Sequence, residues 1–266
     1  LHRAGSAAQA ASLLASIPGA RLVAGGTDLL PNLRRGIGAP PALVDLSGIA
    51  GLDAVARDAQ GWRFGAGVSL ATISADAALV RELPALAQAA ASVAGPGHRG
   101  VATLGGNLCL DTRCVYYNQG EWWRRSNGYC LKYGGETCHV APQGRRCHAA
   151  FSGDVAPALI ALDATVEIVG SRAARMLPLA DLYADDGAAC LRLAADELIV
   201  AVRIPPQPQG SRSGYRKARI RGAMDFPLAG VAARVTCDGG RLSGRRLALT
   251  GTNARPLLLA DTDALC

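Results

Sequence analysis

Apolar and polar residues follow different periods along this chain, and the changes of period mark out its elements. Apolar positions recur at helical spacing over residues 7–15, and short apolar runs typical of strands follow at 21–24 and 42–47. Between these two runs lie a glycine pair and a short helical turn that ends at Gly36. The pattern therefore predicts a compact βαβ unit in residues 1–50.

A second region, residues 51–205, combines strand and helix periods. Its predicted elements are, in chain order, a strand from 62, helices over 70–79, 82–93 and 154–162, and strands over 164–170 and 196–205. Residues 206–214 are rich in Pro, Gly and Ser and predict a linker. Residues 215–266 predict a C-terminal domain built on strands. The chain begins at Leu1 without Met and ends at Cys266 inside structured sequence, so we expect this domain to be truncated.

Periodicity is lost from residue 111 to 150, within an insertion that we place at 109–150. A loop of this length inside a compact domain is usually functional or disordered, and the adjacent Trp122 and Trp123 argue against disorder. The chain has eight cysteines, and five of them fall between 109 and 147. Disulfide frameworks belong mostly to small secreted domains, whereas this chain is large and half apolar. The clustered thiols therefore suggest a metal.

The four candidate ligands have the spacing Cys114-x15-Cys130-x7-Cys138-x8-Cys147. This spacing contains neither the close cysteine pairs of structural zinc sites nor the short runs of ferredoxins. The residues alone leave an iron–sulfur cluster, zinc, disulfides and plain structural thiols open, with the cluster favoured.

Other residues of the loop suggest supporting roles. His139 and His148 each follow a cysteine, and we expect them to form hydrogen bonds or pack beside the metal rather than bind it. Four aromatic side chains would shield such a centre from water or simply pack the loop. They are Trp122, Trp123, Tyr129 and Tyr133.

Two glycine pairs follow strand-like stretches, in "VAGGTDLL" (23–30) and "ATLGGNL" (102–108). Glycine lets a backbone approach an anion closely, and free N–H groups at the start of a helix can bind a diphosphate. Neither segment has the GxGxxG or GK[ST] pattern of the common nucleotide-binding motifs. Each alone would be an ordinary tight turn, whereas the two together would hold one diphosphate from both sides.

The formal net charge of +7 comes almost entirely from dispersed arginines. Without a run of basic residues a nucleic-acid partner is disfavoured, and an anionic cofactor, an anionic substrate or an acidic partner subunit would use the same charge. No apolar run approaches the roughly 20 residues of a membrane-spanning helix, and the opening stretch predicts an amphipathic helix rather than a signal peptide. We expect a cytoplasmic protein that binds neither membrane nor nucleic acid.

Five segments together resemble a known family, and they occur in that family's order. They are "AGGTDLLPNLRRG" (24–36), "ATLGGNL" (102–108), "SGDVAPAL" (152–159), "DELIVAVRIP" (196–205) and "KARIRGAMDFPLAGVA" (217–232). The chain resembles the FAD-binding medium subunits of the molybdenum hydroxylases, which include xanthine dehydrogenase and carbon monoxide dehydrogenase.

The resemblance implies an α+β fold with an N-terminal βαβ subdomain, a mixed α/β FAD-binding subdomain and a C-terminal sheet-plus-helix domain. FAD would lie between the first two. The two glycine turns would hold its diphosphate, and the last three residues of the implied set would lie farther along the cofactor, toward the flavin. The set is Ala24, Gly25, Gly26, Thr27, Asp28, Thr103, Gly105, Gly106, Asn107, Asp154, Ile199 and Lys217.

The insertion is absent from most members and resembles that of the β subunits of 4-hydroxybenzoyl-CoA reductases, where four cysteines hold an additional 4Fe–4S cluster. This resemblance implies Cys114, Cys130, Cys138 and Cys147 as ligands and leaves Cys109 out. Electrons would pass from ferredoxin through this cluster and FAD to the 2Fe–2S subunit and the molybdenum-cofactor subunit of a heterohexamer-type complex. The complex would reduce 4-hydroxybenzoyl-CoA to benzoyl-CoA in anaerobic aromatic degradation, with no catalytic residue on this chain.

Three alternatives remain from the sequence. One is the FAD subunit of another molybdenum hydroxylase, which would act on a different aromatic substrate. The second is a metal-stabilised nucleic-acid-binding module, which would bind no flavin and would lose affinity as salt is added. The third is a stand-alone flavin oxidase, which would have no need of four cluster thiols.

Overall fold

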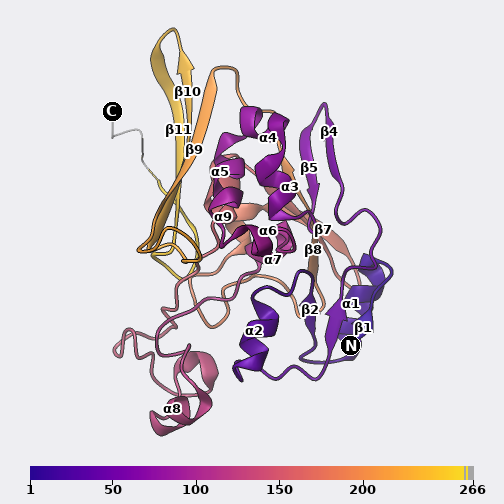
Figure 1. The fold of residues 1–266 in the computed structure, drawn as a ribbon, viewed down its shortest axis with the longest axis vertical. Coiled ribbons are helices and arrows are strands. Elements are labelled where there is room, and N and C mark those ends of the chain that lie inside the picture. Colours follow the sequence, from indigo (N-terminus) through magenta and orange to yellow (C-terminus); the bar gives the residue numbers. More distant parts are fainter. Residues whose placement is uncertain (261, 263–266) are drawn as a thin grey trace.

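The computed structural model describes residues 1–260 and 262, which form three β-sheets and a set of short helices (Figure 1). A layer of helices lies between a four-stranded sheet and a five-stranded sheet, and the small N-terminal unit lies beside the five-stranded sheet. The cysteine-rich loop projects at the opposite end from the tips of β10 and β11. None of the helices in the described residues has the length and apolar composition of a membrane span. The mixed organisation of sheets and helices that the sequence led us to expect is confirmed.

The N-terminal unit is a three-stranded parallel sheet with the order β1-β3-β2. Its elements are β1 (His2–Arg3), α1 (Ala7–Ser16), β2 (Arg21–Val23), α2 (Leu29–Arg34) and β3 (Leu43–Asp45). Ser6 begins α1 because its side chain accepts a hydrogen bond from the backbone N–H of Gln9. This arrangement matches the βαβ unit predicted for residues 1–50.

The five-stranded sheet is antiparallel and has the order β4-β5-β8-β6-β7. Its strands are β4 (Val55–Asp58), β5 (Gly61–Gly65), β6 (Thr165–Val169), β7 (Ala174–Pro178) and β8 (Leu198–Ile204). The three inner strands carry the predicted strand patterns. The two edge strands, β4 and β7, were not predicted, because most of their side chains are exposed and show no apolar alternation.

Seven short helices of this region complete the second unit. They are α3 (Leu70–Ala75), α4 (Ala77–Glu82), α5 (Pro84–Ser92), α6 (Pro96–Arg99), α7 (Leu104–Leu108), α9 (Val155–Ala161) and the 3-10 turn η2 (Leu179–Leu182). The helix predicted over 70–79 is two helices, because Asp76 ends α3 and its carboxylate caps the N–H groups of α4. The helix predicted over 82–93 begins at Pro84, which suits the first turn of a helix.

The C-terminal sheet is antiparallel, with the order β12-β11-β10-β9. Its strands are β9 (Ser211–Ala218), β10 (Ala229–Asp238), β11 (Arg241–Thr250) and β12 (Leu257–Leu258). The linker predicted over 206–214 is wrong for its last four residues, because β9 begins at Ser211, which pairs with Thr236 of β10. Residues 261 and 263–266, where the expected truncation at Cys266 falls, lie outside the described residues.

The cysteine-rich loop has little regular structure, as its lack of periodicity predicted. It contains α8 (Glu121–Ser126) and the 3-10 turn η1 (Leu131–Tyr133). Two backbone hydrogen bonds of 2.9 Å between Arg113 and Ala150 close its base. Farther out, the buried Arg124 donates to the carbonyl of Gly36, so the loop is also tied to the end of α2.

Small residues let the helices approach the sheets closely. Every residue of α9 is buried, and α9 packs on β10 and β11 while α5 packs on β9. One core cluster runs from Val44 in the N-terminal sheet through Phe64 in β5 to Ala248 in β11. The three units therefore share a continuous apolar core, which fixes their relative positions.

One ion network crosses the five-stranded sheet and provides a test of the fold. Glu167 of β6 accepts hydrogen bonds from Arg63 of β5 and Arg203 of β8, whose backbones pair directly. The hydrogen bond from Arg63, with a further contribution from Arg203, holds the pKa of Glu167 below its ordinary value.

We expect Glu167→Gln to lower the free energy of unfolding by about 2 kcal/mol at pH 7, because two opposed guanidinium groups lose their counter-charge. A lowered folded pKa gives stability that is present above the unfolded pKa and is lost as the pH falls through the folded one. Urea unfolding should therefore show the difference from wild type shrinking below about pH 4. The exposed Glu136→Gln is the control, and an equal effect in both variants would contradict this assignment.

Candidate functional site

The first glycine turn joins β2 to α2 and packs directly against the chain that leads into the second turn. A Cβ atom added at Gly25 would lie 1.9 Å from the carbonyl oxygen of Val101, so no side chain fits there. Gly26 has a φ of +69°, in the left-handed region that favours glycine. The glycine pair is therefore required both by the close approach and by the backbone conformation.

The second turn begins α7. The hydroxyl of Thr103 accepts a hydrogen bond of 3.1 Å from the N–H of Gly106 and caps the helix. Gly105 donates to the carbonyl of Ala66 at 2.7 Å, and an added Cβ would lie 2.8 Å from the side chain of Ala66. The side-chain oxygen of Asn107 accepts from the N–H of Val155, which joins this turn to the start of α9.

A cavity of about 600 Å³ lies between the two turns. The structure brings to it all of the twelve residues implied by the sequence except Lys217. Those lining it are Ala24, Gly25, Gly26, Thr27, Asp28, Thr103, Gly105, Gly106, Asn107, Asp154 and Ile199. A volume of this size suits a large organic ligand rather than an ion.

Asp154 brings a buried charged group to the wall of this cavity. Its carboxylate accepts a hydrogen bond of 2.7 Å from the Tyr215 hydroxyl and one of 3.0 Å from the Lys217 ammonium group. Burial raises the pKa of Asp154, while the charge of Lys217 acts in the opposite direction. Lys217 thus contacts Asp154 but does not itself line the cavity. Tyr215 belongs to this group although sequence reasoning did not single it out.

Asp111 and Arg113 also line the cavity, and no motif pointed to them. The Arg113 guanidinium lies 3.7 Å from the carboxylate of Asp28 and 3.9 Å from that of Asp111. It is largely buried and places a positive charge beside the first glycine turn. Arginine in such a position suits a phosphate-bearing ligand.

The thiols of the cysteine-rich loop gather from separate turns of the chain. Cys130, Cys138 and Cys147 are buried, and the half-buried Cys114 packs against the small cluster formed by Ile37, Tyr117 and Cys130. Burial raises the pKa of Cys147 to about 11, and the nearby Cys138 and Cys114 act in the same direction. The structure thus places Cys138 and Cys114 near Cys147, and Cys114 beside the cluster that contains Cys130.

Backbone N–H groups donate to three of these sulfur atoms. Tyr117 donates to Cys114 at 3.3 Å and His148 donates to Cys138 at 3.5 Å. Ala149 donates to the Sγ atom of Cys147 at 3.4 Å. Donors of this kind stabilise thiolate sulfur, and they are among the groups that set the properties of metal–thiolate centres.

A segment from outside the loop, residues 185–188, forms one wall of the cysteine site. The side chain of Asp186 accepts from the N–H groups of Cys147 and Ala188, at 3.1 and 2.9 Å. Gly187 donates to the carbonyl of Cys147, and an added Cβ there would lie 3.0 Å from the Cys147 sulfur. Sequence reasoning missed this segment, since nothing in "ADDGAAC" marks a contact with a loop some 40 residues earlier.

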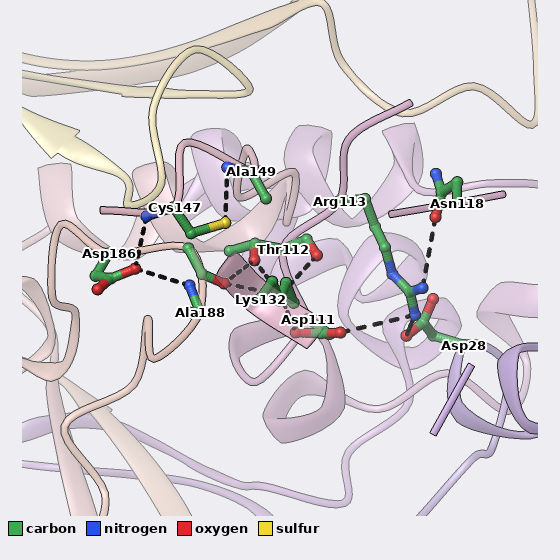
Figure 2. A network of polar contacts seen from close by, with 11 residues as sticks. Asp28, Asp111, Thr112, Arg113, Asn118, Lys132, Cys147, Ala149, Asp186 and Ala188 are labelled. Carbon is green, nitrogen blue, oxygen red and sulfur yellow. Dashed lines mark hydrogen bonds and ion pairs between the residues drawn. The ribbon is translucent and has the colours of Figure 1, made fainter. Parts of the chain in front are cut away.

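Lys132 lies at the centre of the polar network between the cysteine site and the cavity (Figure 2). Its ammonium group donates to Asp111 at 2.7 Å, to the carbonyl of Gly187 at 2.8 Å and to that of Thr112 at 2.9 Å. The Thr112 hydroxyl is a further partner. Only 6% of the Lys132 side chain is exposed, so this is a buried cation, and each of its hydrogen bonds is made to oxygen.

The aromatic residues of the loop fulfil their expected role only in part. Tyr133 packs against the group that contains Cys130, but Trp122 is 78% exposed and shields nothing. The buried Tyr117, which was not predicted, lies there instead. The ring of His139 forms a hydrogen bond with the carbonyl of Tyr129, in line with the supporting role expected for it.

Cys109 lies apart from the four candidate ligands. It lines the cavity, and burial together with the neighbouring Cys190 raises its pKa to about 12. Within residues 1–260 and 262, no three metal-binding side chains converge as they would around a single ion.

Comparison with known proteins matches residues 1–207 to the family described as the FAD binding domain in molybdopterin dehydrogenase. The chain is 36% identical to the Escherichia coli aldehyde oxidoreductase FAD-binding subunit PaoB, over 99% of this chain and 84% of that protein. It is 33% identical to the putative xanthine dehydrogenase FAD-binding subunit XdhB of the same species, over 93% of this chain and 72% of the relative.

Solved structures share the fold over nearly the whole chain. A structure of carbon monoxide dehydrogenase from Hydrogenophaga pseudoflava superimposes with a TM-score of 0.78 at 23% identity and covers 99% of this chain and 78% of that one. The likeness therefore includes the C-terminal sheet, which lies beyond the residues matched by the family. The family matched by residues 1–207 binds FAD, and we expect the cavity between the glycine turns to hold it.

We expect Gly25→Ala to weaken FAD binding about tenfold to a hundredfold, because the new methyl group would force the two turns apart. Titration of the flavin-free protein, followed by flavin fluorescence, measures the affinity. Gly97→Ala is the matched control, since Gly97 lies in α6 and an added Cβ would meet no atom within 4 Å. Unchanged affinity in Gly25→Ala would show that the turns do not meet as described.

Proposed function

Because the chain belongs to the family of FAD-binding domains in molybdopterin dehydrogenases, we propose that it is an electron-transfer flavoprotein subunit whose cysteine loop holds a 4Fe–4S cluster beside FAD. The observation that carries the cluster is the gathering of Cys114, Cys130, Cys138 and Cys147 next to the FAD cavity. The two sites share the short stretch that includes Asp111 and Arg113.

The chain's own residues would bind and orient FAD. The two glycine turns would hold the diphosphate, with Arg113 supplying a positive charge beside the first turn. Asp154, held by Tyr215 and Lys217, would lie farther along the cofactor, and Ile199 would approach the flavin. When bound, FAD supplies the capacity to exchange electrons singly or in pairs.

Two features of the cysteine site support a cluster. Four cysteines are the usual ligands of a 4Fe–4S cluster. Buried sulfur atoms with backbone N–H donors also suit a shielded redox centre.

Substrate chemistry would take place on a partner. We propose a complex of the heterohexamer type with a molybdenum-cofactor subunit and a 2Fe–2S subunit, located in the cytoplasm. Ferredoxin would deliver electrons to the 4Fe–4S cluster, from which they would reach FAD and then the partner's centres. With the substrate chemistry on the molybdenum-cofactor subunit, this chain would need no catalytic residue of its own.

The insertion favours 4-hydroxybenzoyl-CoA as the substrate of the complex, since it resembles that of the reductases acting on this compound. Their reaction consumes two electrons and two protons, replaces the phenolic hydroxyl by hydrogen and releases water. The 36% identity to an aldehyde oxidoreductase subunit favours a second candidate, the oxidation of an aldehyde by water to a carboxylic acid. That reaction releases two electrons and two protons, so the two candidates need opposite directions of electron flow.

Metal and flavin analysis tests the cofactors. The protein purified without oxygen should contain about four irons, about four sulfides and one FAD per chain. Cys138→Ser should lose most of the iron and keep its FAD, while the exposed Cys237→Ser should keep both. Wild type without iron would overturn the cluster, and wild type without flavin would overturn the assignment of the cavity. Loss of iron in Cys109→Ser would instead show that the ligand set is wrong.

The direction of electron flow separates the two substrates. With the purified complex and a reduced low-potential one-electron donor, we expect 4-hydroxybenzoyl-CoA to be converted to benzoyl-CoA, measured by chromatography of the CoA esters. Aromatic aldehydes offered with an oxidised dye should then give little dye reduction. The reverse result would assign the complex to aldehyde oxidation and leave the proposed cofactors untouched.

A further inference from the structure

The side chain of Lys132 is a buried cation whose position is not explained by packing alone. Its ammonium group makes contacts with oxygen atoms of Asp111, Thr112 and Gly187, and its side chain is 6% exposed. Burying a charge is costly unless it is paired, and the one carboxylate that pairs with Lys132, that of Asp111, is itself partly exposed. A neutral hydrogen-bond donor could hold the loop equally well, so the positive charge of Lys132 needs a separate explanation.

Gly187 links the ammonium group of Lys132 to Cys147, one of the proposed cluster ligands. The carbonyl of Gly187 accepts its hydrogen bond, and a Cβ on this same residue would lie 3.0 Å from the sulfur of Cys147. Figure 2 shows Lys132 between Cys147 on one side and Asp111 on the other.

The other charged groups near Lys132 are paired with one another. Arg113 lies between the carboxylates of Asp28 and Asp111, and both Arg113 and Lys132 approach the ring of Tyr117, at 5.3 and 5.0 Å. Lys132, Asp111, Arg113 and Asp28 thus form one row of alternating charges from the cysteine site to the first glycine turn. Within this row, Lys132 is the member that donates to Gly187, the residue packed against the sulfur of Cys147.

We propose that Lys132 is a positioning residue that sets the reduction potential of the cysteine site, where its fixed positive charge favours the reduced, more negative form of the cluster. This inference rests on the proposed function, since it requires the cluster. Net charge, hydrogen bonds to sulfur and exposure are the properties that tune such centres. Lys132 supplies a positive charge, and the negative charge of Asp111 partly offsets its effect on the cluster.

The proposal gives opposite expectations for two variants. Lys132→Met removes the positive charge, so the equilibrium constant for cluster reduction should fall at least about tenfold, which is about 59 mV for a one-electron couple. Asp111→Asn keeps an oxygen acceptor for Lys132 but removes the opposing negative charge, so the same constant should rise severalfold. A purely structural role of Lys132 would not produce shifts of opposite sign.

The experiment is an anaerobic redox titration of each purified protein in its complex, followed by the electron paramagnetic resonance signal of the reduced cluster. Iron and FAD contents are measured on the same samples. Arg125→Met is the matched control, because this arginine lies in the same loop with 73% of its side chain exposed, and it should leave the potential unchanged.

The outcomes separate this inference from the proposed function. A wild-type protein without iron contradicts the proposed function itself. Two results overturn the role of Lys132 when iron is present at the expected level. In one, the equilibrium constant for cluster reduction stays within twofold of wild type in both variants; in the other, it shifts in the same direction in both. If Lys132→Met fails to fold, the rise expected for Asp111→Asn still decides the question.

Discussion

The backbone contact at Gly25 is the constraint on which the cavity between the two glycine turns depends. The first glycine turn belongs to the parallel N-terminal sheet, and Val101 leads into the second turn on the larger unit. The two can meet only because the residue between them has no side chain. Once they meet, Asn107 of the second turn holds the start of α9, and Asp154 just before α9 pairs with Lys217 of β9. The same contact therefore aligns elements of all three sheets around one cavity.

The placement of the cysteine loop follows from that alignment. Its base lies a few residues after α7, where Arg113 pairs with Ala150 through its backbone and with Asp28 through its side chain. The loop has almost no apolar core of its own, since its own cluster comprises only a few residues around Tyr117 and Cys130. Polar contacts replace the core: Lys132 and Arg124 are both buried and hold separate turns of the chain together. An organisation of this kind suits a segment that is completed by a metal centre.

Sequence predicted what is local and missed what is distant. The inner strands, the helices and both glycine turns show in the pattern because each depends on a few consecutive residues, and the four cysteines stand out by type. The edge strands β4 and β7 are polar, and Ser211–Gly214 has the composition of a linker yet pairs with β10. Tyr215, Lys132 and Gly187 act through contacts far along the chain, so no short motif could mark them. Trp122 misled because residue type alone does not determine which side of a helix faces solvent.

The distribution of positive charge also favours an anionic cofactor over nucleic acid. The net charge of +7 does not by itself indicate a partner, but the buried cations Lys132, Arg113 and Arg124 all lie around the cavity between the glycine turns and the cysteine loop. Nucleic-acid phosphates are bound by exposed basic side chains, and burying a cation for that purpose would be counterproductive. The Arg124 guanidinium stacks on Tyr133, and two of its nitrogens have no hydrogen-bond partner among the described residues. Buried positive charge of this kind is compensated when an anionic ligand brings negative charge close to it.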